Sequence, residues 1–321
     1  MKNLEEVREM RVADRLEVTC LVDNVVDDVS SEPRQWVEHP RDWVRTKAFH
    51  RPHAEHGFSL LIRASKGSES HSVMFDAGST ETGAVENAEL LGVDLREVES
   101  LVLSHGHRDH WGGLLAVLHT IGRDKIPLIL HPDVFLKRGR LRRGRVESYS
   151  LFPRMKSLRG AGAKTILKST LHVLAGGMIW TTGEIPHRTD FERGHPSHRV
   201  FVKGKWRRDP WLRDDNALLA NVKGKGLVVF SGCAHAGIVN TVLHAQTITG
   251  VKRVYGIMGG FHLAGRDFEP LISPTVKAIE QIKPGAVVPC HCTGWRGIHA
   301  FAAAMPQAFI QNSVGNRYTI D

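Results

Sequence analysis

The densest group of chemically active side chains in this sequence lies in one hexapeptide, residues 105–110. It places four potential metal ligands, His105, His107, Asp109 and His110, within six residues. A single histidine is more often structural, but four ligand-type side chains this close together favour metal binding. Neutral imidazoles combined with a carboxylate suit zinc, iron or manganese. On a turn after a strand, His105 and His107 can point to one side, while Asp109 and His110 can begin a helix and face a second position.

Other ligand-type residues follow short apolar runs. Residues 73–75 precede Asp76, residues 101–103 precede His105, residues 227–230 precede His235, residues 254–258 precede His262, and residues 286–288 precede His291. Runs of this length rich in Val, Ile and Leu predict buried strands. Helical spacing at 111–120, 238–247 and 273–282 predicts helices between them. The alternation indicates a layered α/β architecture that brings His and Asp side chains to one edge.

Composition sets the class of protein. The 321 residues are 41% hydrophobic and 24% charged, which excludes disorder or a fibrous structure as the main state. No apolar run reaches the ~18–20 residues needed to span a bilayer, and residues 1–15 are charged throughout instead of forming an apolar signal core. The spacing of four cysteines does not fit a disulfide framework. We therefore expect a cytoplasmic protein with free thiols and no membrane partner; nothing in the sequence points to a particular oligomeric state.

Two segments fit the strand and helix pattern poorly. We treat residues 1–321 as one domain with insertions at about 28–56 and 133–170, neither of which has a strand period, and expect them to be lids or binding loops. Two short surface helices are the alternative for the second segment. The formal net charge is +9, and residues 137–168 hold eleven Lys or Arg against one acid, Glu147. This basic segment is either a solvated surface or an anion-binding lid, with Arg140, Arg142 and Arg143 as candidate substrate contacts.

The hexapeptide resembles the His-x-His-x-Asp-His signature of the metallo-β-lactamase superfamily. Asp76 in Phe-Asp-Ala-Gly, His235 in Gly-Cys-Ala-His and His291 in Pro-Cys-His-Cys-Thr-Gly look like its first, third and fifth motifs. Three further segments resemble motifs of the subgroup named after dihydropterin-ribofuranosylaminobenzene-phosphate synthase: residues 55–57, 182–186 and 259–263. Outside the two insertions, the resemblance covers roughly residues 16–293. It implies an αββα sandwich, in which helices flank two central mixed sheets, and two divalent metal ions, zinc first, with manganese or iron as alternatives.

The resemblance and the strand ends together predict two metal positions. His105, His107 and His235 would form the first, and Asp109, His110 and His291 the second. The superfamily usually adds a bridging Asp at its fourth motif, where this chain has Gly-Gly-Phe-His262. We expect His262 to be a ligand, with a substrate contact as the alternative.

Charge and cysteine spacing complete the predicted site. Because Asp109 is the only carboxylate among the expected ligands, two divalent ions would leave the site positive and favour an anionic substrate. Asp76 is expected to orient a ligand histidine rather than bind metal. Cys233, Cys290 and Cys292 are interpreted as packed thiols, since no second cysteine pair completes a zinc knuckle.

The resemblance implies a metal-dependent hydrolase or transferase acting on a phosphorylated small molecule, which is pterin-like in the reaction that gives the subgroup its name. Asp109 would be the catalytic residue, holding or tuning the nucleophile. The loop 182–192 would cover the metal centre, with His187, Arg188 and Asp190 as substrate contacts.

Two other functions are alternatives to this one. A metal-dependent phosphodiesterase or nuclease could bind nucleic acid through residues 137–168, but that segment lacks regular aromatic interleaving, so we favour a small molecule over nucleic acid. A non-catalytic binding protein is disfavoured because no expected ligand is missing.

Overall fold

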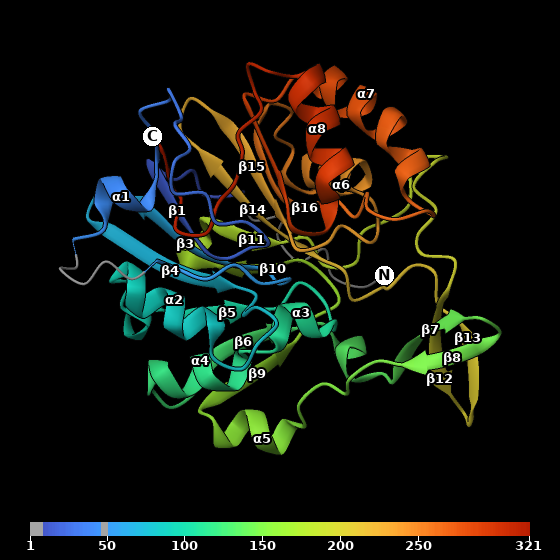
Figure 1. Cartoon of the computed structure of the whole chain (residues 1–321). Helices are drawn as coiled ribbons and strands as arrows, with labels where there is room; N and C mark the ends of the chain where they lie inside the picture. Colours follow the sequence, from blue (N-terminus) through green and yellow to red (C-terminus); the bar gives the residue numbers. More distant parts are fainter. Residues whose placement is uncertain (1–8, 46–50) are drawn as a thin grey trace.

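Two mixed β-sheets pack face to face in the centre of the molecule, and helices cover their outer faces (Figure 1). In this computed structural model, residues 9–45 and 51–321 are described. The larger sheet has the order β2 (Val37–Glu38), β18 (Arg317–Ile320), β1 (Arg15–Val22), β3 (Ser59–Lys66), β4 (Glu69–Phe75), β5 (Ser100–Val102), β6 (Ile126–Leu130) and β9 (Ala163–Leu167). The smaller sheet has the order β10 (His172–Leu174), β11 (Ile179–Thr181), β14 (Ala217–Val222), β15 (Gly226–Ser231), β16 (Val254–Gly260) and β17 (Ala286–Cys290).

The helices form the two outer layers. On the larger sheet lie α2 (Gly83–Leu91), α4 (Leu114–Ile121) and α5 (Met155–Gly160), and on the smaller sheet lie α6 (Ile238–Thr249), α7 (Ile272–Ile282) and α8 (Gly294–Ala304). Two single-turn helices are α1 (Pro40–Trp43) and α3 (Arg108–Trp111). One buried apolar cluster lies between the sheets and one lies under each helical layer. The predicted αββα sandwich is therefore confirmed. Among the described residues, no helix combines the length and apolar character that crossing a membrane requires.

Parallel strand pairing brings the ligand-bearing strand ends together. β4 and β5 run parallel, with Phe75 opposite Val102. β15, β16 and β17 also run parallel, with Ser231 opposite Gly259 and Gly260 opposite Cys290. Because the carboxyl ends of parallel strands lie at one edge, the segments after these strands meet there. The predicted strands at 73–75, 101–103, 227–230, 254–258 and 286–288 lie within or overlap these five elements.

The predicted helix at 111–120 is interrupted. α3 ends at Trp111, α4 begins at Leu114, and the two glycines between them pass against neighbouring backbone. A Cβ at Gly112 would lie 1.9 Å from the carbonyl oxygen of Ser79, and one at Gly113 would lie 2.5 Å from that of Ala77. The chain therefore needs glycine at both positions to turn from the metal-ligand segment into the helix.

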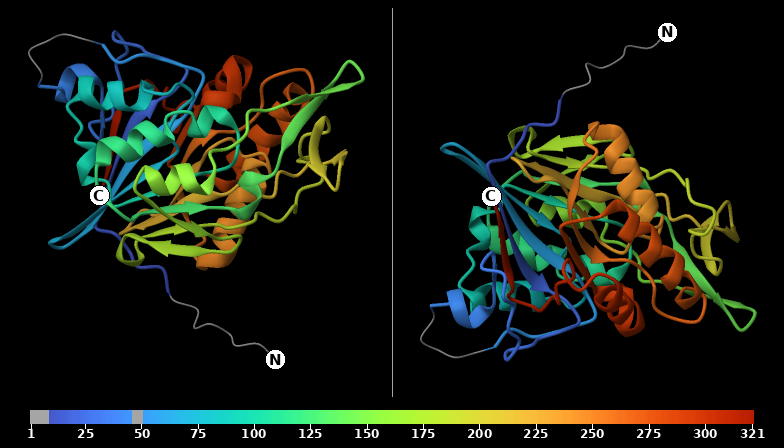
Figure 2. Two further views of the ribbon diagram at one scale, coloured as in Figure 1. Left: turned by 90° about the horizontal axis from the view of Figure 1, so that it is seen from below. Right: turned by 90° about the horizontal axis from the view of Figure 1, so that it is seen from above.

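The prediction that residues 133–168 lack strands is wrong. The segment contains a hairpin of β7 (Arg138–Arg142) and β8 (Arg145–Ser148), then α5, then β9, which pairs parallel with β6 at the edge of the larger sheet. The hairpin joins β12 (His198–Val202) and β13 (Lys205–Arg208) in a third sheet of order β13-β12-β7-β8. We call it the basic sheet; it extends away from the sandwich (Figure 2). The alternative of two surface helices is also wrong, since α5 is the one α-helix of this segment and most of the remaining chain is strand or turn.

The other expected insertion, residues 28–56, includes both regular and irregular chain. β2 and α1 lie within it, and β2 pairs antiparallel with β18, so this segment also contains a strand that its pattern did not predict. Positions 46–50, like positions 1–8 of the charged amino-terminal stretch, lie outside the described residues.

Candidate metal centre

Three imidazoles converge at the first predicted metal position. Nε2 of His105 lies 3.0 Å from Nδ1 of His107, and Nε2 of His235 lies 3.1 Å from each of these atoms. Nitrogen ligands about 2.0–2.1 Å from a tetrahedral zinc ion lie roughly 3.3–3.4 Å apart. The three nitrogens are therefore spaced almost as a shared metal ion requires, and the donor set fits zinc.

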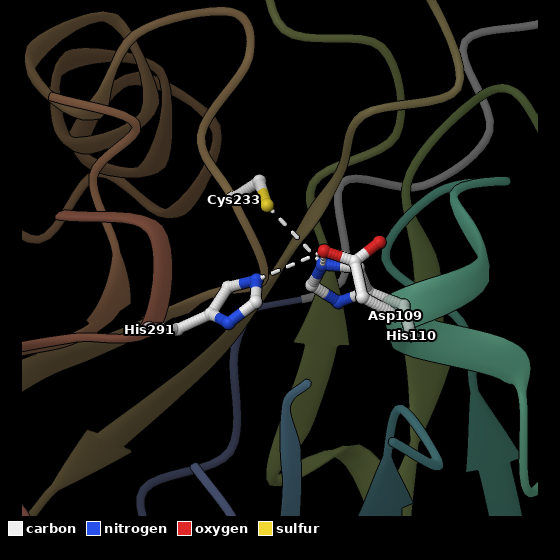
Figure 3. A group of neighbouring side chains, drawn as sticks. All are labelled: Asp109, His110, Cys233 and His291. Carbon is white, nitrogen blue, oxygen red and sulfur yellow. Dashed lines mark hydrogen bonds and ion pairs between the residues drawn. The ribbon is translucent and has the colours of Figure 1, made fainter. Parts of the chain in front are cut away.

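The second predicted position gathers four potential ligands (Figure 3). Oδ2 of Asp109 lies 3.7 Å from Nε2 of His110 and 3.4 Å from Nε2 of His291. Sγ of Cys233 lies 3.1 Å from Nε2 of His110. Asp109 and His110 come from α3, Cys233 from the loop after β15, and His291 from the end of β17. The structure thus brings together all three residues predicted for this position and adds a thiol.

The carboxylate of Asp76 contacts the Nδ1 side of the His110 ring. Its Oδ2 lies 2.6 Å from Nδ1 of His110, and the same carboxylate accepts hydrogen bonds from the backbone N–H and the hydroxyl of Ser104, both at 2.7 Å. Asp76 and His110 are both buried. This contact matches the expected orienting role, because it directs Nε2 of His110 toward Asp109 and Cys233.

Burial keeps most of the ligand imidazoles neutral. Burial lowers the pKa of His105 and His235 well below the usual value, and lowers the pKa of His107 and His291 to about 4. Neutral imidazoles offer lone pairs to a metal.

At the second position, burial and neighbouring charges shift the pKa values of His110 and Asp109 in opposite directions. Burial acts to lower the pKa of His110, but the carboxylates of Asp76 and Asp109 outweigh it and raise that pKa. Burial acts to raise the pKa of Asp109, yet His110 and His291 hold it below its usual range. The Asp109 carboxylate is therefore anionic and is available to bind a cation.

Buried ring nitrogens without partners point to a missing group. Nδ1 of His262 is buried and makes no hydrogen bond within the described chain, and the buried Nε2 of His291 has only the long contact of 3.4 Å with Oδ2 of Asp109. Buried polar atoms in proteins are almost always satisfied, so such atoms in one cluster call for an ion or another partner. The residues of both positions fit divalent metal ions by donor type, spacing and unmet bonding capacity.

His262 lies close to His235 of the first position and to Cys233 of the second. Its ring centroid is 4.3 Å from that of His235, and its ligand atom groups with those of Cys233 and His235 within 4.8 Å. Both predicted roles stay open, since the ring also lines the cavity described next.

A cavity of about 760 Å³ opens onto both positions. Its wall includes His107, Asp109, His262 and His291 from the candidate metal centre. Basic and polar side chains complete it, among them Arg108, Arg140, Tyr149, His195, His198 and Arg266. The cavity is therefore rich in hydrogen-bond donors next to the candidate ligands.

Most of the predicted substrate contacts do not reach this cavity. Arg140 lines it, but Arg142 and Arg143 lie at the tip of the β7–β8 hairpin, where the side chain of Arg142 is 66% exposed and pairs with Glu147. The hairpin extends away from the sandwich, which moves its tip away from the metal centre.

The loop predicted to cover the metal centre also lies elsewhere. His187 contacts Trp211 with ring centroids 3.6 Å apart and the rings tilted, and both residues line a separate cavity. The backbone N–H of Arg188 donates to Asn240 of α6, and the backbone carbonyl of Asp190 accepts from Arg193. These contacts hold the loop on α6, so the assignment of His187, Arg188 and Asp190 as contacts in the metal-bearing cavity is corrected.

Sequence reasoning missed the residues that the basic sheet brings to the cavity. His195 and His198 stack with centroids 3.9 Å apart, and His198 lies 5.2 Å from the ring of His107. Tyr149 contacts His107 edge-on at 5.0 Å. Burial lowers the pKa of His195 to about 4 and that of His198 further, so both are neutral. The available signal was a pair of histidines three residues apart, directly before the alternating run that forms β12.

Comparison with known proteins agrees with this arrangement. A family model described as the metallo-β-lactamase superfamily matches residues 54–190. The chain is 29% identical to the 7,8-dihydropterin-6-methyl-4-(β-D-ribofuranosyl)-aminobenzene-5'-phosphate synthase of Methanocaldococcus jannaschii, over 80% of this chain and 87% of that protein. A second protein of that organism, itself uncharacterized, is 28% identical over 79% of this chain and 90% of its own length.

Two solved structures share the fold. One, described as a metal-dependent hydrolase of the β-lactamase superfamily, has a TM-score of 0.70 at 24% identity and covers 95% of this chain and 98% of its own. The metallo-β-lactamase fold protein YhfI from Bacillus subtilis has a TM-score of 0.51 at 10% identity, covering 96% of this chain and all of its own. At these identities, the likeness concerns the fold.

Proposed function

The chain belongs to the metallo-β-lactamase superfamily, and we propose that it is a metal-dependent hydrolase or transferase acting on a phosphorylated small molecule. The observation that carries this proposal is the single cavity whose wall contains residues of both predicted metal positions. A substrate in that cavity would contact both positions at once. The name of the Methanocaldococcus relative specifies a 5'-phosphate of a dihydropterin derivative, which supports a phosphorylated substrate.

The charge of the cavity supports an anionic substrate. Three arginines line it, Arg108, Arg140 and Arg266, against two carboxylates, Asp109 and Asp267. Two divalent ions would add further positive charge. Arginine guanidinium groups form strong charge-assisted hydrogen bonds with phosphate oxygens. We therefore place the phosphate of the substrate on the side of the cavity where the basic sheet supplies Arg140.

Divalent ions at these positions would supply Lewis-acid activation of a water molecule or of a substrate oxygen. The chain's own residues perform the positioning. His105, His107 and His235 would hold one ion, and His110 and His291 would hold the other together with Asp109. Oδ2 of Asp109 faces the candidate ligand imidazoles and the cavity, so it is the carboxylate that can orient the nucleophile.

The first experiment is metal analysis of protein purified without chelator, followed by a panel of phosphoester and lactone substrates. We expect close to two equivalents of divalent metal, and turnover of a phosphoester that chelator abolishes and added metal restores. Turnover of lactones alone would contradict a phosphorylated substrate.

A matched pair of arginine variants tests the phosphate side. Arg140→Ala removes a residue of the cavity wall, whereas Arg142→Ala removes an exposed residue of the same strand. One charge-assisted hydrogen bond contributes about 1.5–3 kcal/mol, so we expect KM for the phosphoester to rise about tenfold or more in Arg140→Ala alone. Equal KM values in the two variants would remove Arg140 from the binding site.

The basic sheet supports a second candidate function, a phosphodiesterase acting on nucleic acid. Its exposed strands and turns carry Lys137, Arg140, Arg142, Arg143, Arg145, Arg199, Lys203, Lys205, Arg207 and Arg208, with Glu147 as the one acid in residues 137–148 and 198–208. Lys137 also lies over the rings of Phe201 and Trp206, at 5.1 and 5.7 Å. Binding of an oligonucleotide that weakens steeply with salt would favour this function. Salt-independent or undetectable binding would leave the small-molecule substrate.

A further inference from the structure

Cys233 takes part in two of the three potential ligand groups of the described chain. Its Sγ groups with Asp109, His110 and His291, and it also groups with His235 and His262, in each case with all ligand atoms within 4.8 Å. His235 in turn belongs to the three-imidazole group of the first position. The thiol therefore lies on the side of the second position that faces the first.

The thiol is directed at ligand atoms rather than into apolar packing. Cys233 is buried, and its Sγ lies 3.1 Å from Nε2 of His110, the ring nitrogen left free by Asp76. The neighbouring Nε2 of His291 is also buried, in a residue that is only 3% exposed, and it faces Oδ2 of Asp109 at 3.4 Å. A buried ring nitrogen that faces only a candidate ligand carboxylate, beside the thiol, is independent evidence that a cation binds at this point.

The structure also explains why the usual bridging carboxylate is missing. At the end of β16, a Cβ on Gly260 would lie 2.4 Å from the carbonyl oxygen of Gly232 and 2.6 Å from Sγ of Cys292. A Cβ on Gly259 would lie 1.9 Å from the carbonyl oxygen of Ser231. No side chain fits at either position, because Gly259 packs against the end of β15 and Gly260 against the loop that carries Cys233. Neither position can therefore carry a carboxylate, whereas the neighbouring loop carries the thiol of Cys233.

We propose that Cys233 binds metal as a thiolate and gives the second position four protein ligands, Asp109, His110, Cys233 and His291. The thiol proton leaves to solvent when the Sγ–metal bond forms. With two anionic ligands instead of one, this position binds its ion more tightly than the three-imidazole position. A site with thiolate, imidazole and carboxylate ligands in fourfold coordination selects zinc over manganese. The first position keeps three protein ligands and hence an open place for water or substrate.

X-ray absorption on zinc-loaded wild-type protein tests the proposal without any substitution. We expect a sulfur shell at about 2.3 Å from zinc, at half an equivalent or more per ion. Cobalt-loaded protein should show thiolate-to-cobalt charge-transfer absorption in the near ultraviolet. Zinc with only nitrogen and oxygen neighbours, at two bound equivalents, would overturn the proposal.

Two cysteine variants identify the sulfur. Cys233→Ser should abolish the charge-transfer band and weaken one zinc equivalent by ~10-fold or more. Cys292→Ser is the matched control, since Cys292 also lies in this region and lines the cavity, and it should keep both the band and the affinity. A band that survives in Cys233→Ser but disappears in Cys292→Ser would overturn the assignment to Cys233.

The proposal shares with the proposed function only the premise of metal binding. Phosphoester turnover by a protein whose zinc has no sulfur neighbour would overturn the thiolate ligand and leave the proposed function standing. A sulfur shell in a protein without phosphoester turnover would support the thiolate ligand and contradict the proposed function.

Discussion

Replacing Asp76 by Asn should weaken metal binding at the second position without changing any metal ligand. In the wild-type chain, the Asp76 carboxylate accepts the Nδ1–H of His110 at 2.6 Å, which leaves the lone pair of His110 on Nε2, the nitrogen that faces Asp109 and Cys233. The Asn side chain has the same shape, and its amide oxygen can still accept the backbone N–H of Ser104. Its amide N–H₂ then faces His110 and requires an acceptor there, so the imidazole proton moves to Nε2 and blocks the metal.

Asp76→Asn should lower two separate quantities, the affinity for metal and the unfolding free energy of the metal-free protein. Removing the partner that orients a ligand histidine typically weakens metal binding 10–100-fold, or about 1.4–2.8 kcal/mol. In metal-free protein, Asp76→Asn also replaces a charge-assisted hydrogen bond between buried groups, which costs about 1.5–3 kcal/mol of unfolding free energy. Because Asp76 is only 3% exposed, water does not replace the lost bond.

Isothermal titration of chelator-treated protein with zinc measures the first loss, and urea unfolding in chelator measures the second. Asp94→Asn is the control, because Asp94 is an exposed carboxylate that pairs with Arg96 away from the metal centre. We expect the control to bind both zinc equivalents as the wild type does. Two unchanged equivalents in Asp76→Asn would refute the orientation of His110 by Asp76 as the source of affinity.

Three further predictions concern other parts of the molecule. His262→Ala should weaken one metal by ~10-fold or more in the same titration if the ring is a ligand, and should lower turnover alone if it contacts substrate. Gly260→Ala should lower the unfolding free energy by about 1–3 kcal/mol by overpacking, whereas Gly160→Ala, with no atom within 4 Å of the added Cβ, should not, as thermal unfolding will show. Burial raises the pKa of Glu192 to about 7, so the folded protein holds the Glu192 carboxyl proton more tightly than the unfolded chain does. The stability that results is present in full below about pH 4.3. It falls by about 3 kcal/mol as the pH rises to 7. Urea unfolding of metal-free Glu192→Gln at pH 5 and pH 8 should lack this part of the decline, and a decline equal to that of the wild type would exclude Glu192 as its source.

The sandwich and the places where ligands gather could be predicted because local signals agree there. Each buried strand is a short Val, Ile and Leu run, and each is followed by a polar residue that has no reason to lie in a core. The helix at 238–247 has apolar periodicity and appears as α6. Parallel pairing then requires the strand ends to meet, so the sequence order of Asp76, His105, His235 and His291 was sufficient to group them.

The basic sheet could not be predicted in this way. β7 reads Arg-Gly-Arg-Leu-Arg and is exposed along most of its length, so no apolar alternation marks it as a strand. Its pairing with β12 joins residues about sixty positions apart, with His198 opposite Arg140. Only this long-range register brings His198 beside His107. The misplacement of His187 has the same cause, because the loop's position depends on contacts with α6 that are distant in sequence.

The proposed role of Cys233 depends on backbone conformation, which the sequence does not reveal. Four residues of the centre have left-handed backbone: Asp76 (φ 62°), Ala234 (φ 54°), His262 (φ 45°) and His291 (φ 48°). Each lies one to three residues beyond the end of β4, β15, β16 or β17. Since none is glycine, nothing in the residue types predicted these turns.

These turns link the stability of the fold to its metal centre. Left-handed backbone costs a non-glycine residue about 1–2 kcal/mol, so four such residues oppose folding by an amount comparable with the whole stability of a typical domain, about 5–15 kcal/mol. Surrounding contacts hold them in place: Asp76 is fixed by Ser104, and the backbone N–H of His291 donates to the buried carboxylate of Asp23 at 2.9 Å. The left-handed turns that carry the candidate ligands therefore form before metal binds, and their strain lowers the stability of the metal-free protein. Because an ion binds the folded state and its ligands are apart in the unfolded chain, metal binding stabilises the fold by mass action. The strained corners thus favour a protein that is well folded with metal and markedly less stable without it.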